Sequence, residues 1–136
     1  MKRVFSLLLG LLFLITLAAC NNDLQPATTQ AITPAVGICL PNEQTRWLAD
    51  CQALTSGLEA IGYDVLAEYA QDDSSLQTSQ VEALIDQKVK CLIIAPVDPL
   101  SLTNVLQHAK EENIPVIALD RMIMHTDWVS AYVGFD

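Results

Sequence analysis

Short apolar runs alternate with longer amphipathic stretches from residue 35 onward, and this alternation constrains the fold more than any other feature of the chain. The apolar runs that have the length of a β-strand are 35–40, 63–70, 91–96, 114–120 and 128–135. Between the first four, apolar residues recur every three or four positions, which is the period of a helix. Strands that are apolar on both faces and alternate with helices predict a parallel sheet covered on both sides, because each face must be buried. Right-handed crossovers then predict a doubly wound α/β sheet, most simply of strand order 2-1-3-4-5.

Capping residues set the limits of the helices expected between these strands. Asn42 is placed to cap the first helix, and Ser74 or Ser75 opens the second. The pair Asp98 and Pro99 has the pattern of an N-cap followed by a proline at the first helical position, which starts the third helix. The residues of the first helix expected to face inward are Trp47, Leu48, Cys51, Leu54, Leu58 and Ile61.

The N-terminus has the features of a secretion signal. Lys2 and Arg3 precede an apolar run over residues 4–17, which is shorter than the roughly twenty residues of a membrane-spanning helix. The sequence Leu-Ala-Ala-Cys at 17–20 resembles the bacterial lipobox, in which the cysteine receives a diacylglycerol before cleavage. We therefore expect Cys20 to become a lipidated N-terminus. The alternative is a soluble secreted protein in which Cys20 falls at this position by chance.

The chain is thus expected to have three segments. Residues 1–19 are a lipoprotein signal peptide, residues 20–34 are a lipid-anchored flexible tether, and residues 35–136 are a folded lobe. Two or three acyl chains bury enough methylene groups to anchor a protein stably in a membrane. The expected location is therefore extracytoplasmic, with the lipid anchor in the cell membrane and the lobe on the periplasmic side or at the cell surface.

Charge and cysteine content exclude several kinds of partner. Sixteen Asp and Glu stand against seven Lys and Arg, a net charge of -9, and such an acidic surface repels phosphate backbones, so we expect no nucleic-acid partner. Cys39, Cys51 and Cys91 lie within apolar stretches and cannot all pair with one another, so they are expected to be small buried hydrophobic residues. His108 and His125 are isolated, and we expect neither a metal site nor a cofactor.

Ligand chemistry is expected in the loops that follow the strands, because ligands of open α/β sheets bind beyond the carboxyl ends of the strands. Arg46 and Trp47 lie in or just after the first such loop, and Asp120 and Arg121 follow the fourth strand. A guanidinium group donates hydrogen bonds to the hydroxyls of a polyol, a carboxylate accepts them, and an indole covers the apolar face of a sugar ring. The four residues therefore point to a carbohydrate ligand.

Three segments also carry a resemblance to a known family. They are PVIALDRMI at 115–123, CLIIAPVDP at 91–99, and the pair Arg46 and Trp47. Together they resemble the extracytoplasmic sugar-binding proteins of ATP-driven importers, the group of ribose, xylose and multiple-sugar receptors. Members of this family have a second lobe of similar size. The resemblance therefore implies that residues 35–136 are an incomplete N-terminal lobe of a two-lobed periplasmic-binding-protein fold.

The resemblance also implies roles for individual residues. Asp120 and Arg121 are expected to bind sugar hydroxyls, and Arg46 and Trp47 are expected to contact the sugar. Asp98, in the loop after the third strand, is a further candidate. Each has a structural alternative: an exposed ion pair for Asp120 and Arg121, a core position for Trp47, a surface charge for Arg46, and the helix N-cap for Asp98.

The expected function is binding without catalysis. We expect the protein to bind a monosaccharide, a pentose or a hexose, and to deliver it to the membrane permease of an ATP-driven importer. The sequence has neither a G-x-S-x-G nor a G-x-x-x-x-G-K motif, so an enzyme is not expected. Two alternatives stay open: a sugar-sensing receptor or chemotaxis binding lobe, and a truncated fragment without a function of its own.

Overall fold

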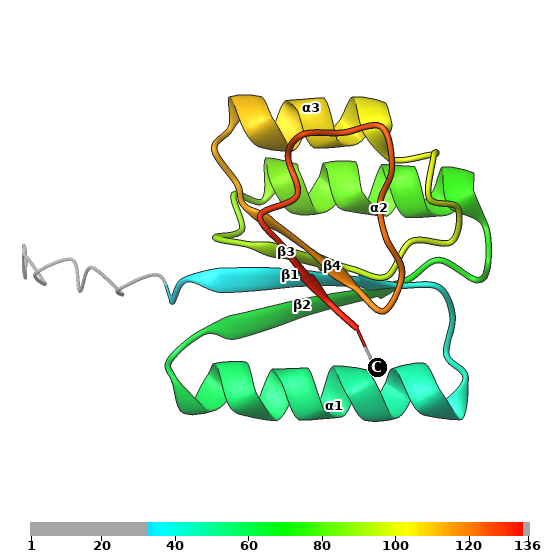
Figure 1. Cartoon of the computed structure of the whole chain (residues 1–136). Coiled ribbons are helices and arrows are strands. Elements are labelled where there is room, and N and C mark those ends of the chain that lie inside the picture. Colours follow the sequence, from blue (N-terminus) through cyan, green and yellow to red (C-terminus); the bar gives the residue numbers. More distant parts are fainter. Residues whose placement is uncertain (1–32, 135–136) are drawn as a thin grey trace, which may run out of the picture. The chain divides into compact units, whose positions relative to one another are not determined.

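The computed structural model of the chain describes residues 33–134, which form a layered α/β domain (Figure 1). The predicted signal peptide, Cys20 and nearly all of the predicted tether lie outside the described residues. In chain order the elements are β1 (Ala35–Leu40), α1 (Thr45–Ala60), β2 (Asp64–Tyr69), α2 (Ser74–Asp86), β3 (Leu92–Ile94), α3 (Thr103–Glu111), β4 (Val116–Leu119) and β5 (Ala131–Val133). The strands pair in parallel in the order β2-β1-β3-β4-β5, which confirms the predicted doubly wound sheet. Within the described part of the chain, no helix is long and apolar enough to cross a membrane.

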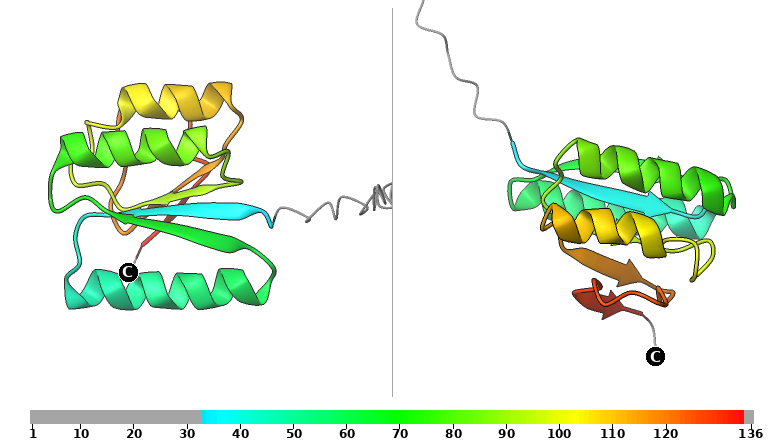
Figure 2. Two further views of the ribbon diagram at one scale, coloured as in Figure 1. Left: turned by 180° about the vertical axis from the view of Figure 1, so that it is seen from behind. Right: turned by 90° about the horizontal axis from the view of Figure 1, so that it is seen from above.

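Two hydrophobic cores lie on opposite faces of the sheet. Helices α2 and α3 cover one face, and α1 covers the other (Figure 2). Successive residues of a strand point to opposite faces, so Leu92 and Ile94 of β3 pack towards α2 and α3, whereas Ile93 packs towards α1. Each fully buried aliphatic side chain contributes about 1.5–3 kcal/mol, so β3 links the two cores and helps to fix the sheet between its helices.

Strand β5 is the least covered strand of the sheet. Its residues Ala131, Tyr132 and Val133 are all exposed. Helix α1 contacts β2 and β1, at the opposite side of the sheet from β5. The α1 face of β4 is consequently only half-buried at Ile117 and Leu119.

The loop after β1 differs from its prediction. Helix α1 begins at Thr45, and the prediction that Asn42 caps it is wrong. The Asn42 Oδ1 atom accepts a hydrogen bond from the Gln44 N–H at 3.0 Å, and its Nδ2 donates to the Asp72 carboxylate oxygens at 2.8 and 2.9 Å. Asn42 therefore ties the loop after β1 to the loop after β2, because a carboxylate in the second loop attracts its amide group.

Helix α1 faces the sheet along a narrow stripe. Trp47 and Cys51 are buried as expected, but the prediction that Leu48 and Ile61 face inward is wrong, since they are 44% and 69% exposed. The side of the helix that packs on the sheet is therefore narrower than its apolar stripe.

The segment before α3 also differs from its prediction. The helix begins at Thr103, and the prediction that Asp98 is its N-cap is wrong. The Asp98 Oδ1 atom accepts a hydrogen bond from the Leu100 N–H at 2.9 Å, and its carbonyl accepts one from the Ser101 hydroxyl at 3.1 Å. An aspartate side chain stabilises a turn in this way as readily as it caps a helix, which is why the sequence pattern fitted both.

The three cysteines of the described residues are free thiols that behave as apolar groups. Cys39 and Cys51 are buried and Cys91 is half-buried, in accord with the prediction. Burial raises the pKa of the Cys39 thiol to about 12 and also raises the pKa of Cys91, because a thiolate loses its hydration in the core. Cys39 and Cys91 are therefore protonated at neutral pH.

Candidate functional site

The loops after β1 and β4 bring two of the predicted residues into direct contact at the carboxyl edge of the sheet. Arg46 is the second residue of α1, and Asp120 follows β4 directly. The Arg46 Nη2 atom lies 2.5 Å from Asp120 Oδ1, and its Nε lies 3.7 Å from an oxygen of Asp50. The Arg46 side chain is 50% exposed and the Asp120 side chain 18% exposed. A ligand can therefore reach the guanidinium group from solvent, while the carboxylate is partly shielded.

Trp47 lies beneath two guanidinium groups. The residue is only 3% exposed and belongs to the core between α1 and the sheet. The guanidinium carbon of Arg46 lies 4.7 Å from the ring centroid, and that of Arg121 lies 5.5 Å from it, both within the range of a cation–π contact. Trp47 is thus a core residue, which was the alternative to a ligand contact in the sequence analysis. Its ring also contacts the guanidinium groups of both arginines.

The turn after β4 holds Asp120 in an uncommon backbone conformation. Its φ of 61° lies in the left-handed region, which only a few per cent of non-glycine residues adopt. The Arg121 N–H closes the turn by donating to the Leu119 carbonyl at 2.6 Å. Strand β5 adds two bonds, because the Asp120 N–H donates to the Val133 carbonyl at 2.6 Å and the Tyr132 hydroxyl donates to the Asp120 carbonyl at 3.0 Å. A backbone conformation of this kind destabilises the folded state by about 1–3 kcal/mol, so it persists only where surrounding contacts such as these hydrogen bonds hold it.

Arg121 joins this turn to the loop after β3. Its Nη1 atom donates a hydrogen bond to the carbonyl of Pro96, a buried residue, at 3.1 Å. Asp98 lies two residues further along the same loop, where it is exposed and its carboxylate accepts from the Leu100 N–H. The structure thus brings four of the five predicted ligand residues into one cluster, in which Arg46 and Arg121 lie over the Trp47 ring and Asp120 pairs with Arg46. Asp98 lies in the loop that Arg121 contacts.

A buried glutamine that the sequence analysis did not single out shapes that loop. Gln77 in α2 is fully buried. Its Nε2 atom donates to the Ala95 carbonyl at 2.9 Å, and its Oε1 accepts from the Val97 N–H at 2.8 Å. The available signal was its position four residues before Val81, which places a polar side chain on the apolar stripe of α2. Tyr132, the other residue missed, gave no signal because it lies on an exposed strand.

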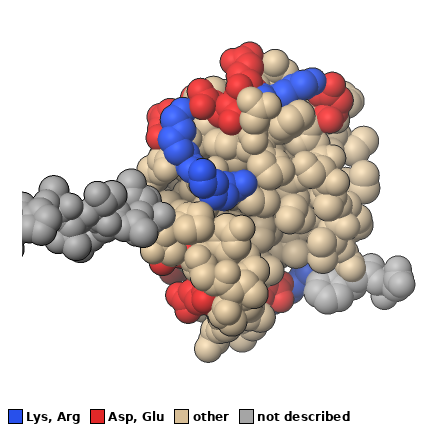
Figure 3. Space-filling model, turned by 90° about the vertical axis from the view of Figure 1, so that its left-hand side faces the viewer, with Lys and Arg blue, Asp and Glu red and all other residues tan. Residues whose placement is uncertain are grey.

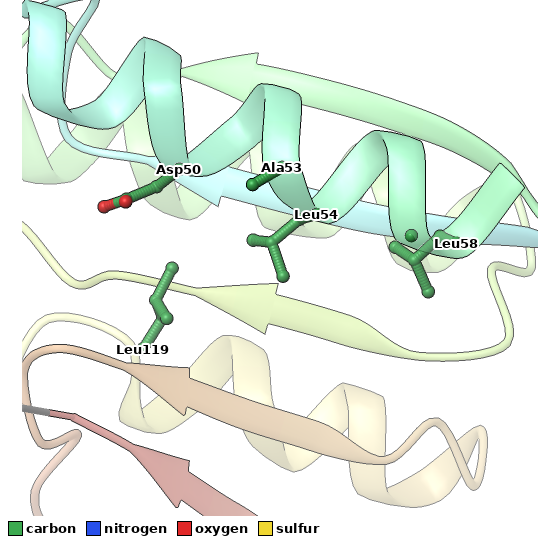
Figure 4. Close-up of a pocket in the computed structure, with 6 residues that line it drawn as sticks. Asp50, Ala53, Leu54, Leu58 and Leu119 are labelled. Carbon is green, nitrogen blue, oxygen red and sulfur yellow. The ribbon is translucent and has the colours of Figure 1, made fainter. Parts of the chain in front are cut away.

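A groove of about 460 Å³ runs along α1 beside these residues. Figure 4 shows Asp50, Ala53, Leu54 and Leu58 on one side of it and Leu119 of β4 on the other. Apart from Asp50, its labelled side chains are aliphatic, and they offer neither donors nor acceptors to the hydroxyls of a polar ligand. The candidate site is therefore the charged surface around Trp47 and not this groove.

The lysines of the described residues lie at the opposite edge of the sheet from the two arginines. Lys88 and Lys90 precede β3, and Lys110 lies near the end of α3, where the strands begin. Figure 3 faces this edge and shows blue and red side chains side by side. The Lys88 ammonium, 2.6 Å from Glu112, lowers the pKa of that carboxyl group, and Lys110, 2.7 Å from Asp127, does the same to Asp127. Lys88 and Lys110 thus form ion pairs with carboxylates away from the candidate site. Among the described residues, the cations at the carboxyl edge are Arg46 and Arg121.

The chain is similar to several proteins of known function. Residues 36–136 match the family described as periplasmic binding protein domain. The multiple sugar-binding periplasmic protein SbpA of Azospirillum brasilense is 38% identical over 104 residues, which are 76% of this chain and 29% of that protein. The multiple sugar-binding periplasmic receptor ChvE of Rhizobium radiobacter is 39% identical over 102 residues, which are 74% of this chain and 29% of the receptor.

A solved structure has the same fold. The crystal structure of an ABC transporter solute-binding protein from Clostridium phytofermentans with bound β-D-glucose matches with a TM-score of 0.73 and 41% sequence identity. The match covers 75% of this chain and 32% of that chain. The match thus covers less than a third of the length of each of these three relatives.

Proposed function

Because the chain belongs to the periplasmic binding protein domain family, we propose that it binds a monosaccharide, a pentose or a hexose, at the carboxyl edge of its sheet. The observation that carries this proposal is the pairing of Arg46 with Asp120 over Trp47, with Arg121 on the same ring. SbpA and ChvE are named as multiple-sugar-binding proteins, and the solved relative holds β-D-glucose. These relatives are binding proteins, so binding is the only chemistry proposed.

The proposed contacts follow from the donors and acceptors at the site. An ionised Asp120 only accepts hydrogen bonds and a guanidinium group only donates them, so neighbouring hydroxyls of a sugar can be held from both sides. Hydrogen bonds to charged groups are roughly twice as strong as those between neutral groups. We propose that sugar hydroxyls insert between Arg46 and Asp120 and that Arg121 donates to a further hydroxyl. Trp47 takes part by supporting the two guanidinium groups that lie over its ring. Asp98 is proposed as a further contact from the loop after β3.

The turn after β4 supports this proposal because it fixes the backbone that carries the Asp120 carboxylate. The bonds from Tyr132 and to Val133 hold Asp120 in place before any ligand arrives. Ordering a side chain on binding costs about 0.5–1.5 kcal/mol, and a turn that is already fixed avoids part of this cost.

We further propose that the protein is a lipid-anchored, extracytoplasmic component of an ATP-driven sugar importer. The Leu-Ala-Ala-Cys sequence supports removal of residues 1–19 and lipidation of Cys20, with residues 20–34 as the tether. Residues 35–136 then act as the N-terminal sugar-binding lobe, in agreement with a match that covers less than a third of the relatives. The bound sugar would pass to a permease in the membrane.

Saturation-transfer NMR observed on the ligand tests the proposal, because it detects weak binding. The full chain is purified in a detergent without a sugar headgroup and mixed with D-xylose, D-ribose or D-glucose. We expect the unsubstituted chain to transfer saturation to at least one of these sugars. The control variant Lys90→Ala, which removes a cation at the opposite edge of the sheet, should do the same. Arg121→Ala should abolish it. The proposal fails if no sugar receives transfer, or if Arg121→Ala behaves like the unsubstituted chain.

A further inference from the structure

We propose that Gln77 is a positioning residue of this ligand site, which acts by holding the loop that fixes Arg121. The inference deepens the proposed function and rests on it. Gln77 contacts neither of the paired residues Arg46 and Asp120; its effect passes through the backbone of residues 95–97.

The contacts of Gln77 replace the sheet hydrogen bonds where β3 ends. The Ala95 N–H still donates to the Cys39 carbonyl at 3.0 Å, in continuation of the ladder between β3 and β1. The next residue, Pro96, has no N–H and cannot extend this ladder. The carboxamide of Gln77 bonds to the Ala95 carbonyl and the Val97 N–H on either side of Pro96. The segment that leaves β3 is therefore held by a side chain from α2.

The Pro96 carbonyl connects this segment to the ligand site. It accepts the hydrogen bond from Arg121 Nη1 at 3.1 Å, and the Arg121 guanidinium carbon lies 5.5 Å from the Trp47 ring centroid. Because Gln77 forms hydrogen bonds with the residues before and after Pro96, it fixes the position of the Pro96 carbonyl, which accepts the hydrogen bond from Arg121. Loss of the carboxamide should therefore let Arg121 move away from the indole.

A buried glutamine could instead stabilise the fold without affecting the site, and Gln80 provides the matched control. It lies one turn further along α2, and its Nε2 donates to the Tyr69 carbonyl at the end of β2 at 3.0 Å. Its Oε1 accepts from the Cys39 thiol of β1 at 3.7 Å. Gln80 thus also joins α2 to strand ends, but its partners are not the residues on either side of Pro96, whose carbonyl Arg121 uses. A role limited to stability predicts similar behaviour of Gln77→Met and Gln80→Met once both are folded.

The experiment measures the dissociation constant of the sugar that the unsubstituted full chain binds, in the same detergent. We expect Gln77→Met to raise it about tenfold, since the two backbone groups next to Pro96 lose their partner, and Gln80→Met to change it less than about twofold. Gln77→Asn keeps a carboxamide on a shorter side chain and should give an intermediate dissociation constant. If Gln77→Met does not fold, Gln77→Asn takes its place as the test variant. In an Arg121→Ala background, Gln77→Met should have no further effect. Equal affinities in Gln77→Met, Gln77→Asn and the unsubstituted chain, or equal losses in Gln77→Met and Gln80→Met, overturn the inference.

A measurement without sugar separates this inference from the proposed function. With Trp128→Phe as the background, Trp47 is the remaining tryptophan of the chain and its fluorescence reports the guanidinium groups above it. We expect Gln77→Met to shift the Trp47 emission and Gln80→Met to leave it unchanged. If the unsubstituted chain binds no sugar, the proposed function fails, whereas an unshifted emission in folded Gln77→Met overturns the positioning role in either case.

Discussion

Replacement of Asp120 by asparagine should separate the binding role of this carboxylate from its role in stability. The substitution removes the charge but keeps the size of the side chain, and asparagine tolerates a φ of 61° better than alanine does. The partner Arg46 is half exposed, and ion pairs of this kind contribute at most about 1 kcal/mol to the free energy of unfolding. Asp120→Asn should therefore lower the free energy of unfolding by less than about 1 kcal/mol.

The effect of Asp120→Asn on sugar binding should be much larger. A bound sugar would cover Arg46 and Asp120, and removal of one partner of a buried, hydrogen-bonded charge pair costs about 2–5 kcal/mol of binding free energy, because the other charge is left without a partner. The dissociation constant should accordingly rise at least about 30-fold.

The assay pairs urea unfolding with sugar titration on the same samples of Asp120→Asn. Asp127→Asn is the matched control, since Asp127 also pairs with a cation, Lys110, at 2.7 Å, but its side chain is 79% exposed and its partner lies at the opposite edge of the sheet. We expect both variants to unfold near the unsubstituted chain and only Asp120→Asn to lose affinity. Equal affinities in the two variants would refute the reasoning.

Three further outcomes are expected. A Cβ atom at Gly37 would lie 3.0 Å from Leu92 Cδ2 and 3.1 Å from Leu84 Cδ1, so Gly37→Ala should lower the free energy of unfolding by about 1–3 kcal/mol; an unchanged urea midpoint would contradict this packing. The Cys39 thiol has a pKa of about 12 in the fold against an ordinary value of 9.0, so the unfolded state loses this proton first and the free energy of unfolding should fall as the pH rises above 9. Cys39→Val should reduce that slope, and an identical slope would speak against the assignment. Cys20→Ala should abolish metabolic labelling by a fatty acid, and persistent label would exclude lipidation at this residue.

The sheet could be predicted because its strands carry their own signal. The runs at 35–40 and 91–96 are apolar at nearly every position, as strands buried on both faces require. The handedness of the crossovers then leaves few possible topologies, and the observed order is the simplest of them. The family resemblance is confirmed by the match over residues 36–136.

The local predictions that failed depended on neighbours distant in the sequence. Asn42 does not cap α1 because its side chain binds Asp72, which lies 30 residues away. Leu48 is exposed because the side of α1 that packs on the sheet is narrower than its apolar stripe. Asp98 has the local pattern of a helix start, but the following residues form turns before α3 begins.

The sheet topology predicts that the site residues lie close together, but it does not predict which residues hold them in place. Parallel strands end at one edge, so Arg46 and Asp120 could be expected to lie near each other, and they do. Gln77 gave only the weak signal of a polar residue at an inward position, and Tyr132 looks like any residue of an edge strand. The roles of the site residues in binding stay predictions.

Titration of the nitrogen-labelled full chain with D-xylose, D-ribose and D-glucose, followed through its two tryptophan indole N–H resonances, tests the central claim most directly. Trp47 lies beneath Arg46 and Arg121 at the proposed site, whereas the Trp128 indole donates to the Ile114 carbonyl at 2.7 Å, before β4 begins. We predict that a bound sugar shifts the Trp47 resonance and leaves that of Trp128 in place. A Trp47 resonance that stays fixed at every concentration of all three sugars, or a shift confined to Trp128, would contradict a sugar site at the carboxyl edge of the sheet.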